Sequence, residues 1–153
     1  TGPSAARGEG IIYVPADGQF DVGEIGRFLE AAEHADIVVG ARESRSDYTL
    51  FRLASSRTFL ALVKLLFGTD VRDVNWVHLW HRRVFERVSV RSRGVFLLEE
   101  ILVRGERESL TGAEVDSAYR PRAGGAATGG NPRTILRTIR EMALLRAELW
   151  IRG

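Results

Sequence analysis

The pattern of apolar and polar positions divides the chain into short strands and longer helices. Residues 11–14 form an apolar, β-branched run that predicts a covered strand, and residues 36–41 and 114–119 predict two more strands. Apolar positions at helical spacing predict helices over residues 21–33, 50–67, 82–89, 99–105 and 133–151. Residues 73–80 are expected to be extended. Strands and helices that alternate in this way indicate an α/β fold.

Local signals mark several helix ends. Asp21 followed by Glu24 has the spacing of a capping box, so a helix is expected to begin there. Gly68 is placed to end the helix of residues 50–67 as a C-cap, and Pro132 suits the first turn of the last helix. The segment 123–132 is rich in glycine and small residues, and it predicts a flexible loop before that helix.

The composition is that of an ordinary globular domain. The chain has 153 residues, of which 44% are hydrophobic and 27% are charged. There is no cysteine, which excludes a disulfide framework and a thiolate metal site. No apolar stretch is long enough to span a bilayer, and the N-terminus lacks the pattern of a signal peptide. We therefore expect a cytoplasmic protein.

Arginine supplies nearly all the positive charge. The formal net charge is +2 and the isoelectric point is about 9.5, with Lys64 the only lysine. The planar guanidinium binds phosphate with two parallel hydrogen bonds, which suits diphosphates and lipid phosphates. The arginines are spread along the chain and no nucleic-acid-binding motif is present, so we do not expect a nucleic-acid partner.

The last predicted helix, residues 133–151, is amphipathic and rich in arginine. Two interpretations remain open. The helix can pack on the core of its own domain, or it can lie on an anionic membrane surface as a peripheral contact at the inner face of a membrane.

The strongest candidate for chemistry follows the first strand. The apolar run ends at Pro15, and Asp17, Gly18 and Gln19 come directly after it. Open α/β sheets bind ligands at the carboxyl ends of their strands, and a carboxylate there suits Mg²⁺ or Mn²⁺ bridging a diphosphate. The alternative is structural: Asp17 and Gly18 form a turn and Asp21 caps a helix.

Several segments resemble family 2 glycosyltransferases, especially those that make polyprenyl- or dolichyl-phosphate sugars. Residues 16–21 resemble the Asp-Ala-Asp-Gly-Gln-Phe-Asp stretch of that family, and residues 37–42 resemble its Val-Val-Gly-Ser-Arg. Residues 71–75 are similar to Val-Lys-Asp-Val-Asn, residues 99–103 to a Glu-Ile-Leu segment, and residues 119–125 to an Arg-Pro-Arg loop. The motifs occur in the family's order.

The resemblance implies a GT-A fold, a three-layer α/β/α arrangement around a mixed sheet. We assign it to residues 1–130 as the catalytic part, followed by a C-terminal amphipathic helix in residues 131–153. It also implies inverting transfer of a sugar from a nucleotide-diphospho-sugar to an acceptor, with a polyprenyl-phosphate lipid as the expected acceptor and Mg²⁺ or Mn²⁺ as the cofactor.

The sequence departs from the family in two places. Pro15 stands where the family has the first aspartate of its Asp-X-Asp motif. The family's Asp-Asp-Gly-Ser segment, which holds the nucleotide, is not found in this chain. We therefore expect the chain to be the metal and acceptor half, with an N-terminal half or a second copy completing it. The alternative is a degenerate glycosyltransferase-like module that binds without catalysis.

The resemblance implies that four residues bind the donor, the metal and the acceptor. Asp17 and Gln19 are expected to hold the metal and the leaving diphosphate. Asp73 is the candidate base, or the carboxylate that orients the acceptor, and Asn75 lies in the same motif at the substrate site. The alternative for Asp73 is a cap or an ion pair with Arg42 or Arg72.

Phosphate binding is assigned to Arg42, Arg120 and Arg122, each of which follows a predicted strand. His78 is expected to hydrogen-bond a substrate or a neighbouring carboxylate, and Glu100 to contact the acceptor or hold one of these arginines. Glu99 is expected to face solvent.

The segment 76–81 departs from the family's pattern. Trp76 and Trp80 are either stacking platforms for a sugar or prenyl chain or parts of the core. His78 and His81 are three residues apart, a spacing that would suit a metal ion on one face of a helix, but the expected extended backbone would point them to opposite faces.

Overall fold

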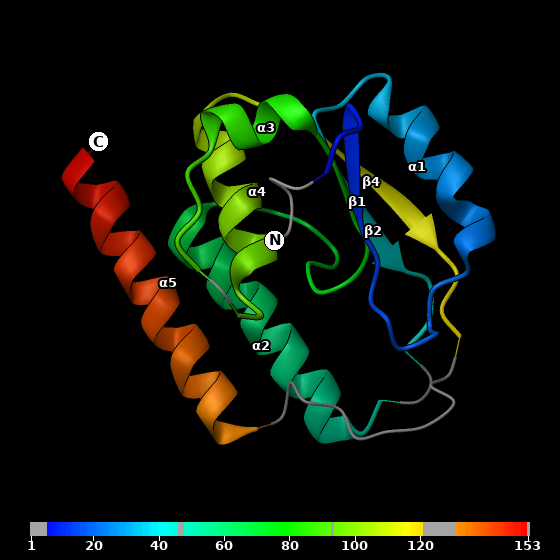
Figure 1. Ribbon diagram of the computed structural model, residues 1–153. Helices are drawn as coiled ribbons and strands as arrows, with labels where there is room; N and C mark the ends of the chain where they lie inside the picture. The colour runs from blue at the N-terminus through cyan, green and yellow to red at the C-terminus, as the bar shows by residue number, and fades with distance from the viewer. Residues whose placement is uncertain (1–5, 46–47, 93, 121–130, 153) are drawn as a thin grey trace.

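The computed structural model describes residues 6–45, 48–92, 94–120 and 131–152 (Figure 1). In chain order its elements are β1 (Gly10–Tyr13), the 3₁₀-helix η2 (Val22–Glu24), α1 (Ile25–Ala32), β2 (Ile37–Arg42), α2 (Leu50–Phe67), β3 (His78–His81), α3 (Arg82–Arg87), α4 (Leu97–Arg107), β4 (Gly112–Ser117) and α5 (Pro132–Arg152). Each predicted helix and strand is present, with ends that differ by a few residues.

The four strands within these described ranges form one mixed sheet with the order β1-β3-β2-β4. β3 lies antiparallel between β1 and β2, while β4 pairs with β2 in parallel. Helix α1 covers one face of the sheet, and α3 and α4 cover the other (Figure 1). The structure thus confirms the predicted three-layer α/β fold.

Alternation along β2 divides the core between the two faces. Ile37 and Val39 point to the cluster shared with α3 and α4, whereas Val38 points to the cluster shared with Phe28 of α1. Successive side chains of a strand face opposite ways, so a strand that is apolar at every position must be covered on both sides. The run Ile-Val-Val therefore specifies helices on both faces of the sheet.

A third apolar cluster lies outside the sheet and joins α2, α4 and α5. Val63 and Phe67 of α2 meet Phe96, which precedes α4, and Met142 and Leu145 of α5. Met142 and Leu145 are spaced for one face of a helix, and this is the face that α5 buries. Of the two interpretations of this helix, packing on its own domain is confirmed for that face.

Local signals set the ends of α2. The Thr49 hydroxyl accepts a hydrogen bond from the backbone N–H of Arg52 at 3.2 Å, and Gly68 adopts φ = 82° directly after the helix. Only glycine reaches this left-handed conformation without a steric penalty. The predicted C-cap is confirmed.

The predicted capping box does not form. Asp21 caps η2 by accepting from the N–H of Gly23 at 3.1 Å, as expected of a cap residue. The carboxylate of Glu24 instead accepts from Ser117 Oγ at 3.0 Å and from the N–H of Ala118 at 2.9 Å. Tertiary contact with the end of β4 replaces the local bond.

The first strand is less covered than its composition predicts. β1 lies at the edge of the sheet, with β3 as its one partner among the described strands, and Tyr13 is exposed. Its apolar side chains Ile11 and Ile12 are half-buried against the two clusters. A β-branched run indicates that a strand packs against helices, but it does not indicate how many strands flank that strand.

Candidate active site

Most of the predicted site residues meet at one edge of the sheet. β1, β2 and β4 all end at this edge, and β3, which runs antiparallel to its neighbours, begins there. The segments that follow or precede these strands carry Asp17, Arg42, Asp73 and Arg120. Residues far apart in the sequence are therefore brought together by the strand directions alone.

A buried ion pair forms the centre of this edge. Arg42 donates from Nε to Asp73 Oδ2 at 2.6 Å and from Nη2 to Asp73 Oδ1 at 2.8 Å. Arg45 adds a second cation 3.0 Å from Asp73 Oδ2. Burial opposes ionisation of Asp73, but hydrogen bonds and charge from Arg42 and Arg45 outweigh it and lower the pKa of the carboxyl. Asp73 is held as an anion.

Aromatic rings enclose the Arg42 guanidinium. Its Nη1 donates to the Tyr48 hydroxyl at 2.5 Å, and its Cζ lies 5.1 Å from the Trp76 ring centre. Tyr119 packs edge-on against Tyr48 and also contacts Trp76. Burial alone would lower the pKa of Arg42, yet the bonds to Asp73 raise it. The arrangement fixes a cation behind the edge in a defined orientation.

Gln19 joins the first motif to the end of β4. Its Nε2 donates to the Tyr119 hydroxyl at 2.5 Å, and its backbone oxygen accepts from the N–H of Arg120 at 2.9 Å. Gln19 is buried, and the exposed Arg120 side chain forms an ion pair with Asp21. The amide of Gln19 thus has a structural partner, and its expected role as a metal ligand stays a prediction.

Asp17 lies in a turn at the mouth of β1. Its Oδ1 accepts from the backbone N–H of Gln19 at 3.2 Å, and Gly18 adopts φ = 72°. Both features belong to the structural alternative that the sequence left open, a turn followed by a capped helix. The carboxylate nevertheless stands at the edge where Arg42 and Arg120 also lie.

The set of candidate ligands for a divalent cation is small. Within the described residues, no three His, Cys, Asp or Glu side chains gather as a metal site. One carboxylate, Asp17, does not suit a resident ion held by protein alone. It does suit a hard cation that keeps several waters and takes further oxygens from substrate phosphates.

The histidines and tryptophans of residues 76–81 pack within the fold, and Trp76, His78 and Trp80 are buried. His78 is fully buried and its Nε2 lies 2.8 Å from the Val74 carbonyl oxygen, and burial lowers its pKa to about 4. His81 Nε2 lies 2.8 Å from the Ala32 carbonyl oxygen, on α1. Trp76 and Trp80 are buried in the two sheet clusters. The interpretation of both tryptophans as core residues is confirmed. His78 is not exposed to solvent, and its role as a substrate ligand stays a prediction.

Glu99 was expected to face solvent, and this expectation is wrong. Its side chain is 0% exposed. Among the described residues, neither carboxyl oxygen has a hydrogen-bond partner with normal geometry. Burial raises the pKa of Glu99 to about 8, with Asn75 offsetting part of the rise and the charges of Asp73 and Glu141 adding to it. Glu99 is therefore neutral at pH 7.

Glu100 holds a different arginine from those expected. Its carboxylate accepts from the N–H of Ser92 at 2.7 Å and from Arg104 Nε at 2.7 Å. Burial opposes ionisation, but the bonds from Ser92 and Arg104 lower the pKa of Glu100. The structure places this residue in the first turn of α4, against the loop that precedes the helix, and a role in acceptor binding stays a prediction.

Two predicted residues complete the comparison. Arg122 lies outside the described residues. Asn75 lies beside the ion pair, where its N–H donates to Asp73 Oδ1 at 3.3 Å. Sequence reasoning missed Arg45, Tyr48 and Tyr119, which surround Arg42. Tyr119 precedes the predicted Arg-Pro-Arg loop, but nothing in its sequence context indicated a partner one hundred residues away.

The fold is that of a GT-A glycosyltransferase. Two solved structures of glucosyl-3-phosphoglycerate synthase from Mycobacterium tuberculosis are similar to this chain, each with a TM-score of 0.66 and 13% sequence identity. One is a complex with Mn²⁺, uridine-diphosphate-glucose and phosphoglyceric acid, and the other is a complex with phosphoglyceric acid.

The similarity covers 95% of this chain and 52% of the synthase, so the chain spans about half the length of its structural neighbour. At this identity the likeness shows the fold alone. No protein-family model matches the sequence, and no curated protein matches it either.

Proposed function

We propose that this chain contributes to the transfer of a sugar from a nucleotide-diphospho-sugar to an acceptor that carries a phosphate. The observation that supports this best is the meeting of Asp17, Arg42, Asp73 and Arg120 at one edge of a GT-A sheet. Glycosyl transfer requires that the negative charge of a leaving diphosphate be neutralised and that both substrates be positioned. The acceptor class predicted from the sequence resemblance is a polyprenyl phosphate.

The state of Asp73 argues for an ionised acceptor. Asp73 is an anion held by two arginines, and a carboxylate with a lowered pKa is a poor base. Its role in this proposal is to position Arg42. A phosphate acceptor is already ionised near neutral pH and needs no base, so the chemistry and the ion pair are compatible.

Arg120 is the arginine best placed to meet a ligand. Its side chain is exposed and its partner Asp21 is half-exposed, so the pair is solvated and exchanges easily. Arg42 is buried and holds Asp73 with two hydrogen bonds, and with Arg45 the cluster has two cations for one anion and a net positive charge behind the site. In this proposal Arg120 contacts phosphate directly, and Arg42 acts through its charge and its hold on Asp73.

The divalent cation is proposed to enter together with the diphosphate. Asp17 would be its protein ligand, with waters and phosphate oxygens completing the shell. When bound, the cation would neutralise charge on the leaving group.

The second candidate function is a binding module without catalysis. Pro15 in place of the first aspartate and the single carboxylate at Asp17 favour this alternative. Such a module would still bind phosphate-bearing ligands at the edge with Arg120, but it would not need a metal. Metal dependence of donor binding therefore separates the two functions.

The test is isothermal titration of the chain with uridine-diphosphate-glucose in the presence and absence of Mn²⁺. Loss of a charge-assisted contact of roughly 1.5–3 kcal/mol predicts that Asp17→Asn weakens Mn²⁺-dependent binding by at least about tenfold. Asp70→Asn is the matched control, because Asp70 is an exposed carboxylate paired with Lys64 beyond the end of α2. Equal affinities in the two variants would remove Asp17 from the site. An affinity for the donor that is the same with and without Mn²⁺ would favour the non-catalytic module.

A further inference from the structure

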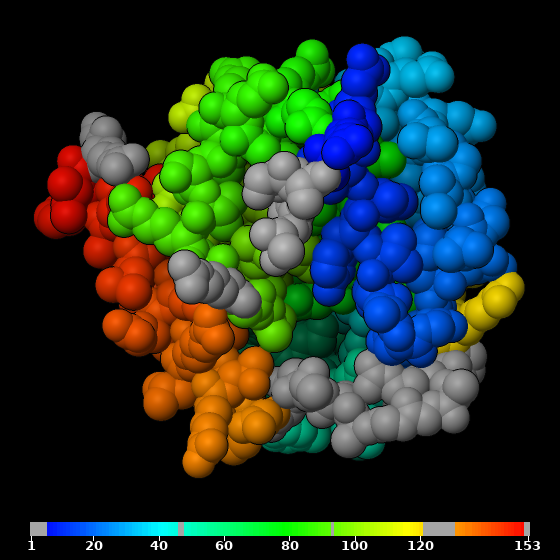
Figure 2. All heavy atoms as spheres, viewed as in Figure 1, coloured from blue at the N-terminus to red at the C-terminus, as the bar shows by residue number. Residues whose placement is uncertain are grey.

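The outer side of α5 carries large apolar side chains that the fold does not cover. Leu136, Ile139, Leu144 and Ile151 are exposed, and Trp150 is 79% exposed. Helix α2 adds Leu62, which is 37% exposed and lines the same groove as Ile139 and Trp150. In both views α5 forms the outer margin of the molecule on the side away from α1 (Figures 1 and 2). Contiguous apolar surface of this kind marks an interaction site.

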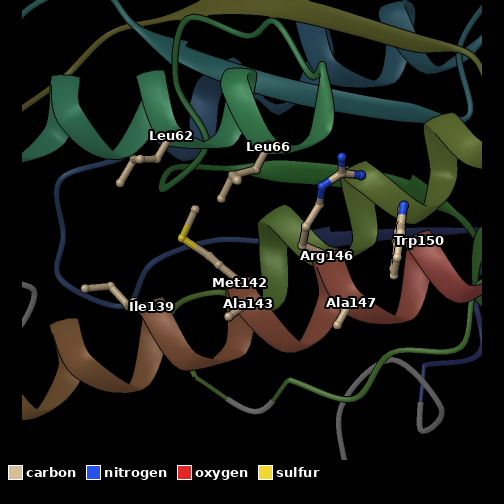
Figure 3. Close-up of a pocket in the computed structure, with 8 residues that line it drawn as sticks. All are labelled: Leu62, Leu66, Ile139, Met142, Ala143, Arg146, Ala147 and Trp150. Carbon is tan, nitrogen blue, oxygen red and sulfur yellow. The ribbon is translucent and has the colours of Figure 1, made fainter.

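A shallow groove runs between α2 and α5 and deepens this surface. It encloses about 590 Å³ and is lined by Leu62, Leu66, Ile139, Met142, Ala143, Arg146, Ala147 and Trp150. Figure 3 shows Leu62 and Leu66 reaching from α2 toward α5, with Arg146 and Trp150 standing along the same side. The lining has one charged side chain, the cation of Arg146.

The exposed charges of α5 are all positive. Both of its glutamates turn inward: Glu148 binds Arg104 at 2.8 Å and Arg91 at 3.2 Å, and Glu141 pairs with Arg137 at 2.9 Å. Arg133, Arg140 and Arg146 are exposed, and none of the carboxylates that the structure describes forms an ion pair with them. The outer face of α5 therefore combines apolar side chains with unpaired cations.

This combination selects one kind of partner. A second copy of the chain would place arginines against arginines, which costs free energy. A nucleic acid would satisfy the arginines but would leave the leucines, isoleucines and tryptophan exposed. An anionic bilayer satisfies both, because phosphate head groups pair with arginine while Trp and aliphatic side chains enter the acyl boundary. Among the described residues no helix has the length and apolar character to cross a bilayer, so the contact is peripheral.

We propose that the outer face of α5, with Leu62 of α2, is a docking surface for anionic lipid bilayers. Arg140 and Arg146 engage head groups, and Trp150 and Ile139 bury in the interface. A helix of this length lying flat extends about 30 Å along the membrane surface. The proposal does not depend on glycosyl transfer, because none of these residues belongs to the sheet edge with Asp17 and Arg42.

The experiment measures vesicle binding of the chain by tryptophan fluorescence. Trp76 and Trp80 are buried, so of the three tryptophans Trp150 is the one whose emission responds to a bilayer. We expect a blue shift with vesicles of phosphatidylcholine mixed with phosphatidylserine, none with phosphatidylcholine alone, and weaker binding at high salt. In Trp150→Phe the shift disappears while co-sedimentation with the mixed vesicles persists.

Charge location is tested by paired variants of equal net charge. Arg140→Ala with Arg146→Ala should weaken partitioning into the mixed vesicles by roughly thirtyfold, since each arginine near an anionic surface contributes about fivefold. Arg7→Ala with Arg27→Ala is the control and should bind as the parent does. Circular dichroism checks that both variants are folded.

Three outcomes would overturn the proposal. The first is no binding to either vesicle. The second is equal weakening by the two double variants, which would mean that net charge alone attracts the protein. The third is a concentration-dependent dimer, or tighter binding to an oligonucleotide than to mixed vesicles, where the dimer or the oligonucleotide binding is lost in the Arg140 and Arg146 double variant. Either result would assign the surface to a different partner.

Discussion

Replacing Glu99 by glutamine is expected to stabilise the protein increasingly as pH rises above about 4.5, fully so above about pH 8, and to change its stability little below pH 4.5. The glutamate carboxyl is fully buried on α4, near Asn75, Asp73, Glu141 and Tyr13. Ionisation would place a charge in a site where none of the described residues supplies a cation to pair with it. The amide has nearly the same shape and carries no charge at any pH.

The size of the effect follows from the pKa of Glu99, about 8 in the folded chain against 4.5 for the ordinary side chain. The folded state binds this proton more tightly than the unfolded state, so stability falls as pH rises from 4.5 and stops falling above 8. Each pKa unit is worth about 1.36 kcal/mol, so the loss between pH 4.5 and pH 7 is roughly 3 kcal/mol. Glu99→Gln removes this loss.

The assay is urea unfolding of the parent and Glu99→Gln at a series of pH values, since titrations common to both cancel in the difference. Glu100→Gln is the matched control on the neighbouring residue. Its carboxylate is stabilised by Ser92 and Arg104, so its pKa is lowered and its contribution to stability is lost as pH falls. The two variants should therefore show opposite trends with pH. Parallel stability curves for the parent and Glu99→Gln would refute the burial argument.

Two further predictions concern stability. Asp73→Asn should lower the free energy of unfolding in denaturant by about 3–5 kcal/mol, because it leaves Arg42 buried without its anion. The control Asp116→Asn breaks only an exposed pair with Arg72 and should cost less than about 1 kcal/mol, and equal costs would contradict the burial of the Arg42–Asp73 pair. Gly40→Ala should cost about 1–3 kcal/mol by thermal unfolding, because its Cβ would lie 2.9 Å from Trp76 Cδ1 and 3.0 Å from a backbone oxygen; Gly26→Ala, with open space around it, is the control.

The sequence determined much of the secondary structure because the signals involved are local. Helix α2 follows from apolar periodicity between a threonine cap and Gly68, both of which act within one turn. The apolar run of β2 specified a strand covered on both faces. The turn at Asp17 and Gly18 and the cap at Asp21 were also readable, since each hydrogen bond spans two residues.

The sequence also indicated the edge at which the candidate site forms. Residues that follow successive strands of an α/β sheet converge wherever the strands run the same way, so Asp17, Arg42 and Arg120 could be grouped before any contact was known. It could not specify the partner of each residue. Asp73 was open to a role as a base, as the carboxylate that orients the acceptor, or as an ion-pair partner; the structure shows the ion pairs with Arg42 and Arg45, and a role beside the acceptor stays a prediction.

Only the tertiary structure decided which polar groups are buried. Glu99 and Glu100 are adjacent and chemically identical, yet one is neutral and the other is an anion, because Arg104 and the loop at Ser92 reach only the second. Glu24 likewise accepts hydrogen bonds from Ser117 and Ala118, 93 and 94 residues away, in place of the expected capping-box bond. Charge states and long-range partners depend on what other segments bring to a side chain, and a one-dimensional pattern does not contain that information.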